Sequence, residues 1–166
     1  MLIIFGGLPG TGKSTLALRL AGEVGAVYLR IDTIERAMVD TNEVLSVGEG
    51  GYLVAYAVAE DNLRLGHTVI ADSVNPLQIT RSAWRNVAER AGVNAVEMEV
   101  VCSDQAEHRR RVEMRSHDIP VTWQEVVERD YEPWMGEHIR IDTAGQKIEQ
   151  SLEALRRALA AGLRRL

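Results

Sequence analysis

The most chemically informative stretch of the sequence is a glycine-rich octapeptide near its beginning. It consists of Gly7, Leu8, Pro9, Gly10, Thr11, Gly12, Lys13 and Ser14, and it fits the pattern G-x-x-x-x-G-K-[ST] in full. Glycines in such a loop let backbone N–H groups turn inward around an anion, because no Cβ atom obstructs them. We therefore expect this octapeptide to bind the phosphates of a nucleoside triphosphate.

The residues that close the octapeptide have separate predicted tasks. We expect Lys13 to reach the β- and γ-phosphates, the Ser14 hydroxyl to ligate Mg²⁺ and Thr15 to meet the α-phosphate. An apolar run at residues 2–5 precedes the loop, and a helical pattern begins at residue 13. The positive end of that helix would then face the same anion. The loop thus predicts a nucleoside triphosphate and Mg²⁺ as ligands.

Two aspartates follow two predicted strands. Asp32 comes after the apolar run at residues 27–30, and Asp72 ends the apolar run at residues 68–71. Because parallel strands end at the same edge of a sheet, we expect both carboxylates to lie beside the loop. Asp72 is predicted to hold Mg²⁺ through water, beside Ser14.

Local structure offers another interpretation of each polar residue at these strand ends. Asp32 with Glu35 has the spacing of a helix capping box. Asp72 could be an ordinary turn residue. Asn75 either contacts an acceptor molecule or caps a helix that begins at Pro76, and the cap is the favoured interpretation.

The remaining sequence alternates between short apolar runs and longer helical patterns. This alternation is typical of an α/β protein with a parallel sheet. We find no repeat and no linker, so we expect residues 1–166 to form a single domain. The predicted strands are residues 2–5, 27–30, 68–71, 95–102 and 139–141, and the predicted helices are residues 13–24, 33–39, 50–65, 76–91, 104–115, 122–131 and 147–159.

Length and composition narrow the class of protein. With 166 residues, of which 46% are hydrophobic and 26% charged, the chain can build one core without disulfides or metals. Its one cysteine, Cys102, suits a reducing compartment, so we expect a cytoplasmic protein. No apolar run approaches the roughly 20 residues of a membrane span, and no leader pattern precedes the glycine-rich loop.

The surface chemistry also limits the partners. The net charge of −5 makes nucleic acid an unlikely general ligand, because nucleic-acid binders are normally basic. The apolar residues Leu53, Val54, Ala57 and Val58 lie on the predicted helix at 50–65 and face either the core or a second copy. A monomer and a homodimer are therefore both open.

Two large classes of nucleotide-binding protein can be excluded. A signalling GTPase needs a base-reading N-K-x-D motif, which is missing from the sequence. Residues 142–145 spell D-x-x-G, but they lie too late in the chain to follow the third strand. A motor ATPase needs a second, helical domain. A compact kinase is what remains.

The complete loop, the two aspartates and an Arg-x-x-x-Arg pair give the chain a clear resemblance. It resembles the small P-loop kinase superfamily, in the group that contains gluconate kinase, adenylylsulfate kinase, the polynucleotide 5′-kinase domain and the chloramphenicol phosphotransferase. The resemblance covers nearly the whole chain, although only the loop is highly specific. It implies a three-layer α/β sandwich with a five-stranded parallel sheet in the order 2-3-1-4-5 and a short lid.

For the acceptor, the resemblance implies roles for two residues. Asp32 would face the acceptor hydroxyl as a base or orienting group. Arg36 would grip the acceptor, although it stands four residues after the aspartate where several relatives have three. A solvated arginine is the alternative for Arg36. Among the aromatic residues, the segment 131–134 is the best candidate for a further acceptor contact.

For the nucleotide, the resemblance implies roles for residues late in the chain. Arg111 would stack on the adenine, and Arg115 would neutralise charge on the phosphoryl group as it moves. A salt bridge from Glu107 to Arg111 is the alternative reading of that helix. Thr143 and Gly145 would lie against the adenine edge, unless they belong to an ordinary strand-to-helix turn.

These observations predict an ATP-dependent kinase that phosphorylates a hydroxyl of a small molecule, such as a sugar, a nucleoside or an antibiotic. One alternative keeps the chemistry but changes the acceptor to a polynucleotide, an RNA end or a nucleotide sugar. Another is an ATP-hydrolysing regulatory module that is not a kinase.

Overall fold

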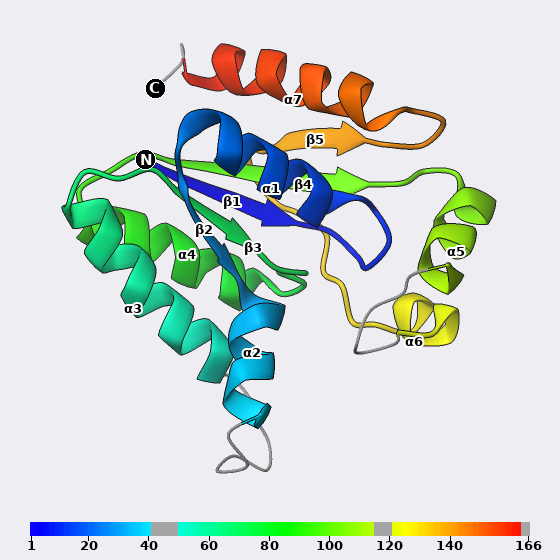
Figure 1. Cartoon of the computed structure of the whole chain (residues 1–166), viewed down its shortest axis with the longest axis horizontal. Helices are drawn as coiled ribbons and strands as arrows, with labels where there is room; N and C mark the ends of the chain where they lie inside the picture. The colour runs from blue at the N-terminus through cyan, green and yellow to red at the C-terminus, as the bar shows by residue number, and fades with distance from the viewer. Residues whose placement is uncertain (41–49, 115–120, 164–166) are drawn as a thin grey trace.

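The computed structural model describes residues 1–40, 50–114 and 121–163 (Figure 1). Its centre is a five-stranded sheet in the order β2-β3-β1-β4-β5, in which every strand pair is parallel. The predicted α/β class and strand order are therefore confirmed. The strands are β1 (Leu2–Gly6), β2 (Val27–Arg30), β3 (Val69–Asp72), β4 (Ala95–Val101) and β5 (Ile139–Asp142).

Helices cover both faces of this sheet, as Figure 1 shows. On one face, α1 (Lys13–Val24) and α7 (Ile148–Leu163) pack against the sheet, and on the other α3 (Gly50–Arg64) and α4 (Gln78–Arg90) do so. Three shorter helices, α2 (Ile31–Asp40), α5 (Gln105–Glu113) and α6 (Trp123–Val127), lie beyond the carboxyl ends of the strands. None of the helices in the described parts of the chain is long and apolar enough to cross a membrane.

The two cores meet at β1. Leu2 and Ile4 face the core beneath α3 and α4, whereas Ile3 and Phe5 face the core beneath α1 and α7. All four side chains are fully buried. A central strand of a parallel sheet is covered on both faces, so it has a continuous apolar sequence instead of an alternating one. That burial fixes the strand whose carboxyl end carries the glycine-rich loop.

Two helix starts differ from the sequence prediction. Helix α4 begins at Gln78 with Leu77 as its N-cap, so the prediction that Asn75 caps a helix at Pro76 is wrong. Asn75 instead adopts a positive φ of 52° and is fully buried. Helix α2 begins at Ile31, so Asp32 lies inside its first turn and does not cap it.

Of the two interpretations of the apolar residues on the long helix, the structure excludes the core, and contact with a second copy stays a prediction. Helix α3 turns Ala55, Ala59 and Leu63 toward the sheet and leaves Leu53, Val54, Ala57 and Val58 exposed. The inward row follows the i, i+4 spacing of one helix face, and small alanines let the helix approach closely. The last helix also runs further than predicted, through Gly162 to Leu163.

A buried arginine on α4 clamps two distant segments together. The side chain of Arg81 is 1% exposed and donates to the Asn75 carbonyl at 3.0 Å and to the Pro76 carbonyl at 2.6 Å. It also donates to the carbonyls of Glu132 at 2.6 Å and Pro133 at 2.9 Å. Five N–H donors in a planar fork suit this task, which a lysine could not perform.

Helix α6 ends at Val127 and not near residue 131 as predicted, and the Arg81 clamp holds the segment that follows it. The Arg81 guanidinium lies 4.5 Å from the centroid of the Trp134 ring, and Trp134 Nε1 donates to the Tyr131 hydroxyl at 2.7 Å. Trp134 packs so closely on Gly6 that a Cβ atom there would collide with its ring. The segment 131–134 therefore supports the strand that leads into the loop.

We predict that Arg81→Met lowers the free energy of unfolding by about 3 kcal/mol or more, because it leaves buried carbonyls without donors. Arg90→Met on the same helix is the control, since Arg90 is half-exposed and pairs with Glu60. Surface pairs of that kind contribute about 1 kcal/mol at most. Urea unfolding of both variants gives the comparison, and equal losses would show that Arg81 is not a structural clamp.

Candidate active site

The glycine-rich loop joins β1 to α1 and has the backbone of an anion cradle. Gly7 has a φ of 141° and Gly12 a φ of 92°, conformations that side chains disfavour. A Cβ atom at Gly7 would also run into the Val100 carbonyl oxygen. Gly12 is the N-cap of α1 and offers no side chain to the first-turn amides. Those N–H groups are therefore available to an anion at the positive end of the helix.

Neighbouring elements hold this loop in shape. His108 on α5 donates from Nε2 to the Pro9 carbonyl at 2.8 Å, and the Thr143 hydroxyl donates to the Thr11 carbonyl at 2.8 Å. Thr11 and Thr143 are nearly fully buried, so these contacts are shielded from water. The loop is thus built before any ligand arrives.

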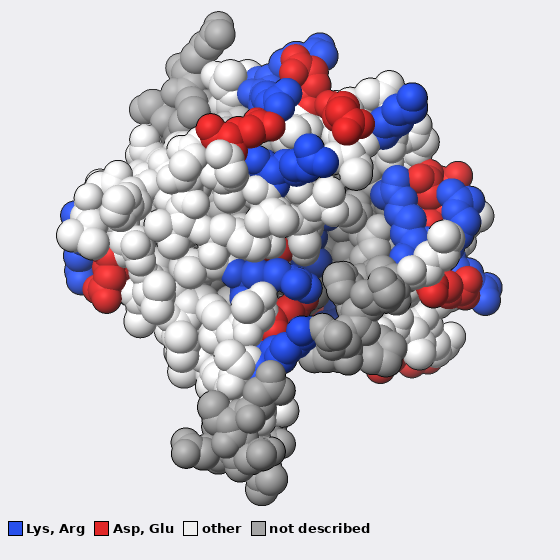
Figure 2. Space-filling model, viewed as in Figure 1, with Lys and Arg blue, Asp and Glu red and all other residues white. Residues whose placement is uncertain are grey.

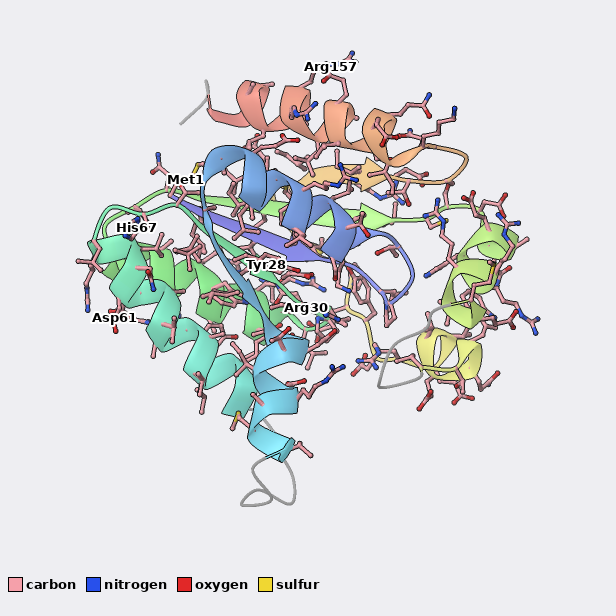
Figure 3. The ribbon with its side chains drawn as sticks, in the orientation of Figure 1. Met1, Tyr28, Arg30, Asp61, His67 and Arg157 are labelled. Carbon is pink, nitrogen blue, oxygen red and sulfur yellow. The ribbon has the colours of Figure 1, made fainter. Side chains whose placement is uncertain are left out.

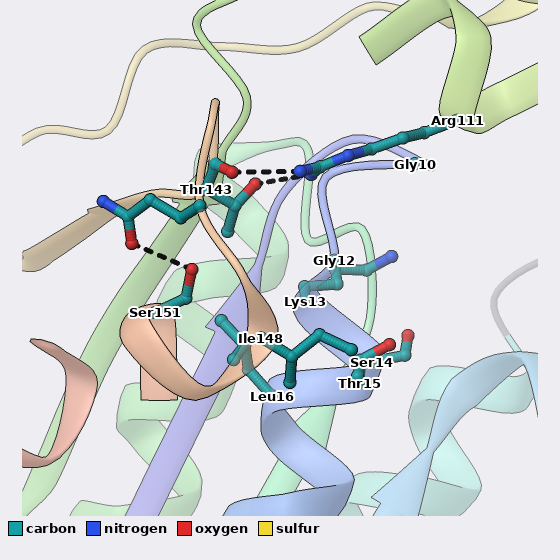
Figure 4. Close-up of a pocket in the computed structure, with 11 residues that line it drawn as sticks. Gly10, Gly12, Lys13, Ser14, Thr15, Leu16, Arg111, Thr143, Ile148 and Ser151 are labelled. Carbon is teal, nitrogen blue, oxygen red and sulfur yellow. Dashed lines mark hydrogen bonds between the residues drawn. The ribbon is translucent and has the colours of Figure 1, made fainter. Parts of the chain in front are cut away.

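A cavity of about 340 Å³, which we call the loop cavity, opens at the start of α1 (Figure 4). Its walls bring together Lys13, Ser14 and Thr15 with Arg111 and Thr143, which come from distant parts of the chain. Lys13 is only 6% exposed, so its ammonium group belongs to the site and not to the open surface. The remaining wall residues are Gly10, Gly12, Leu16, Gln146, Ile148 and Ser151.

Arg111 lines the loop cavity and forms the salt bridge that was the alternative interpretation of its helix, whereas stacking on adenine stays a prediction. Its guanidinium donates to the hydroxyl and the carbonyl of Thr143 at 2.8 and 2.9 Å (Figure 4). It also donates to the Glu107 carboxylate at 2.6 Å. Gly145 does not line the cavity, but its N–H donates to Glu107 at 2.8 Å. That N–H and Arg111 lower the pKa of Glu107. The predicted salt bridge therefore holds Arg111 against the cavity wall.

The other predicted members of the basic helix differ in position. Arg109 forms an exposed ion pair with Glu113 at 2.7 Å, which agrees with a solvated face. Arg115 lies outside the described residues. Gly7, Leu8, Pro9 and Thr11 form the loop itself and are not among the cavity's wall residues.

The Asp72 carboxylate at the end of β3 is buried and only half satisfied. It is 1% exposed, and its Oδ2 accepts a hydrogen bond of 2.6 Å from the Tyr28 hydroxyl. Its Oδ1 has no partner among the described residues. Burial and the Asp72 charge raise the pKa of Tyr28, so this phenol remains a donor. Figure 3 shows Tyr28 on β2, the strand beside β3.

A buried carboxylate oxygen without a partner is costly, so it points to a group that completes it. Carboxylate and hydroxyl oxygens are the ligands that Mg²⁺ prefers, with water and phosphate filling its other positions. Asp72 and the Ser14 hydroxyl therefore fit the predicted ion. Ser73 Oγ and both polar side-chain atoms of Asn75 also lack a hydrogen-bond partner within the described ranges.

A second cavity of about 440 Å³ lies between α2, α3 and α4, and we call it the acceptor-side cavity. Asp32 lines it, and Arg30 donates to the Asp32 carboxylate at 2.8 Å. Glu35 also lines it, one helical turn further on, and burial together with Asp32 raises the pKa of Glu35. Tyr52 supplies a wall from α3.

The acceptor-side cavity adjoins the backbone of the glycine-rich loop at the end of β3. The Gly7 N–H donates to the Val74 carbonyl at 3.0 Å, and Val74 and Ser73 line the acceptor-side cavity. The loop and the acceptor-side cavity therefore share a stretch of backbone directly after Asp72.

Three predicted acceptor contacts do not line this cavity. Arg36, Asn75 and the segment 131–134 are all missing from its wall. Arg36 follows Glu35 on α2, and the segment 131–134 is held by Arg81.

Sequence reasoning missed Glu35, Tyr28, Tyr52 and Ser73 as site residues. Glu35 had a signal, because its i, i+3 spacing from Asp32 puts both carboxylates on one helix face. Tyr28, Tyr52 and Ser73 have no such signal in the sequence, because only the folded chain brings them to the site.

Comparison with known proteins identifies the family. A family model described as an AAA domain matches residues 2–131. A comparison with curated proteins gives no match. Among solved structures, a candidate kinase from Chloroflexus aurantiacus has a TM-score of 0.75 at 23% identity, over 97% of this chain and 96% of that chain.

Two further similar structures contain bound ligands. The APS kinase CysC of Mycobacterium tuberculosis, in complex with AMPPNP and APS, has a TM-score of 0.68 at 22% identity, over 96% of each chain. Kti12 of Chaetomium thermophilum, in complex with ADP-AlF3, has a TM-score of 0.70 at 22% identity, over 95% of this chain and 98% of that chain. The family match spans most of the sequence, and the structural matches share its fold. The chain therefore belongs to the AAA domain family and has the nucleotide-binding fold of the small P-loop kinases.

Proposed function

We propose that the protein is an ATP- and Mg²⁺-dependent phosphotransferase that moves the γ-phosphoryl group to a hydroxyl of a small molecule. The observation that carries this proposal is a pair of cavities at one edge of the sheet, one with Lys13 and the other with Asp32. A protein that only hydrolyses ATP needs no second cavity. We also propose that residues 1–166 act as one domain.

In the nucleotide half of the site, the loop amides and Lys13 hold the phosphates. Arg111 and Thr143 form the wall on the far side of that cavity. Ser14 and Asp72 would hold Mg²⁺, which would supply positive charge against the phosphate oxygens. Tyr28 keeps the Asp72 carboxylate oriented through their 2.6 Å hydrogen bond.

In the acceptor half, Asp32 orients the hydroxyl of the acceptor. Asp32 accepts the hydroxyl proton as the acceptor oxygen bonds to the γ-phosphorus, and ADP leaves with the electron pair of the broken P–O bond. Arg30 restrains the Asp32 carboxylate from β2. Arg115, by its resemblance to lid arginines, stabilises the phosphoryl group in transit.

The test of this proposal is whether hydroxyl compounds stimulate ADP formation. We expect a phosphorylated acceptor to appear in step with ADP. ADP formation that no hydroxyl compound stimulates would favour an ATP-hydrolysing regulatory module. Transfer to polynucleotide ends in preference to small molecules would also contradict the proposal, and the net charge of −5 argues against that outcome.

Lys13→Ala should weaken ATP binding and lower transfer by about 10²–10³-fold, because one preorganised charge at the phosphates is lost. Lys147, the other lysine of the chain, is exposed and gives the control variant Lys147→Ala. Calorimetric titration with AMPPNP and a transfer assay give the two readouts. Normal transfer by a folded Lys13→Ala variant would remove the proposed phosphate role.

Asp32→Asn should leave ATP binding intact and lower transfer by about 10²–10⁴-fold, the usual loss when a general base is removed. Asp61→Asn, on the exposed side of α3, controls for the loss of one negative charge. The measurement is transfer at saturating ATP, beside a melting curve of each variant. If turnover per folded molecule is the same in both variants, Asp32 has no catalytic role.

Tyr28→Phe should lower the affinity of the nucleotide complex for Mg²⁺ by about 10-fold or more. Loss of a hydrogen-bond partner of a metal-binding carboxylate typically lowers metal affinity by that much. Tyr52→Phe is the matched control, since the Tyr52 hydroxyl accepts from the Asn75 N–H, whereas the Tyr28 hydroxyl donates to a carboxylate. Binding of AMPPNP is titrated at a series of Mg²⁺ concentrations. If AMPPNP binding by Tyr28→Phe depends on Mg²⁺ as it does in the unmodified protein, Asp72 does not hold the ion.

A further inference from the structure

Two large apolar side chains stand exposed at the acceptor-side cavity. Leu53 on α3 is 62% exposed and Ile79 on α4 is 73% exposed, and both line the cavity wall. Figure 2 shows that the surface over α3 is largely uncharged. Apolar side chains at a concave site lose contact with water when a ligand with an apolar part binds there.

The inner wall of the cavity has the same character. Of the fourteen described residues that line the whole cavity, nine are aliphatic or aromatic. The Tyr52 and Tyr56 rings lie 5.9 Å apart between centroids. Tyr56 packs edge-on against the buried Trp84 at 4.6 Å and donates to the Thr80 carbonyl at 3.3 Å. These contacts hold the rings as a fixed apolar surface.

Two polar residues, Asp32 and Ser73, mark one end of the cavity. Ser73 directly follows β3, and Asp32 lies two residues after the end of β2. Both residues therefore lie at the end of the cavity nearest the loop. Leu53, Ile79 and Tyr56 belong to α3 and α4, which form the other wall. A hydroxyl at the polar end would therefore meet Asp32 while the remainder of the molecule covers the apolar wall.

The charges of the wall disfavour an anionic acceptor. Asp32 and Glu35 both line it, and among its described wall residues Arg129 is the one base. Arg30 is already engaged by the Asp32 carboxylate at 2.8 Å. A carboxylate or sulfate group on the acceptor would be brought toward two acids.

From this wall we infer that the acceptor is an uncharged hydroxyl compound with an aromatic or aliphatic body, not a sugar acid, a polyol or a sulfated nucleotide. The inference rests on the proposed function, because it names the substrate class of that same site. A cavity of about 440 Å³ falls within the size range of sites for drug-sized molecules.

The experiment compares three probes that share one diol and differ in a single substituent. They are 1-phenylethane-1,2-diol, glycerol and glycerate, which carry a phenyl ring, a hydroxymethyl group and a carboxylate. Their affinities for the full chain with Mg²⁺ and AMPPNP are measured by ligand-observed NMR. We expect the phenyl compound to bind about 10-fold more tightly or better, because about 60 Å² of buried apolar surface accounts for that ratio.

Variants locate the binding. Leu53→Gln and Ile79→Gln should each remove most of the phenyl preference, and both are expected to fold because the side chains are exposed. Leu65→Gln is the control, since Leu65 is 75% exposed and does not line the cavity. Light scattering on the same samples tests whether the surface instead joins two copies of the chain.

The inference is wrong if glycerol or glycerate binds as tightly as the phenyl compound, or if none of the probes binds. It is also wrong if Leu53→Gln and Leu65→Gln behave alike, or if Leu53→Gln changes self-association and not probe binding. The proposed function fails separately. Phenyl-selective binding with no transfer from ATP to any hydroxyl compound would support the cavity's preference and contradict the kinase.

Discussion

The buried Asp72 carboxylate is the constraint on which the rest of the site depends. A charge at 1% exposure is costly unless it is hydrogen-bonded or neutralised, and Tyr28 satisfies only one of its two oxygens. The other oxygen has no partner in the part of the chain that the structure describes. The fold therefore keeps a negative charge beside the loop, and a cation that also binds a phosphate can neutralise this charge. The N-terminal amides of α1 offer the complementary positive field.

The scaffold around this charge is stiff where the chemistry requires fixed geometry. The fully buried strand β1 fixes the start of the loop, and α5 and the turn after β5 hold it from outside through His108 and Thr143. Arg81 joins the backbone after β3 to the segment 131–134. Within that segment, the Trp134 ring packs against Gly6 at the end of β1. Both routes end on the loop, so the nucleotide side of the site is preorganised.

The sequence revealed the parts of the site that follow local rules. The loop pattern, the strand-terminal Asp72 and the Glu107–Arg111 spacing each depend on neighbours within a few residues, and each lies where it was predicted. The Tyr28–Asp72 hydrogen bond joins residues 44 positions apart, and only the pairing of β2 with β3 creates it. The prediction that Asn75 caps α4 was wrong because it also depended on contacts that form only in the folded chain. The Arg81 clamp lies on that segment, and α4 begins two residues later than expected.

If the loop cavity binds a nucleotide with its phosphates on the loop, amide NMR with Mg²⁺ and AMPPNP shows this most directly. We expect the largest shift changes at residues 10–15 and at Thr143, around the loop cavity. Amides of Tyr56 and Ile79, on the far wall of the acceptor-side cavity, should change little. Changes centred on Tyr56 and Ile79, or none at residues 10–15, would contradict phosphate binding at the loop.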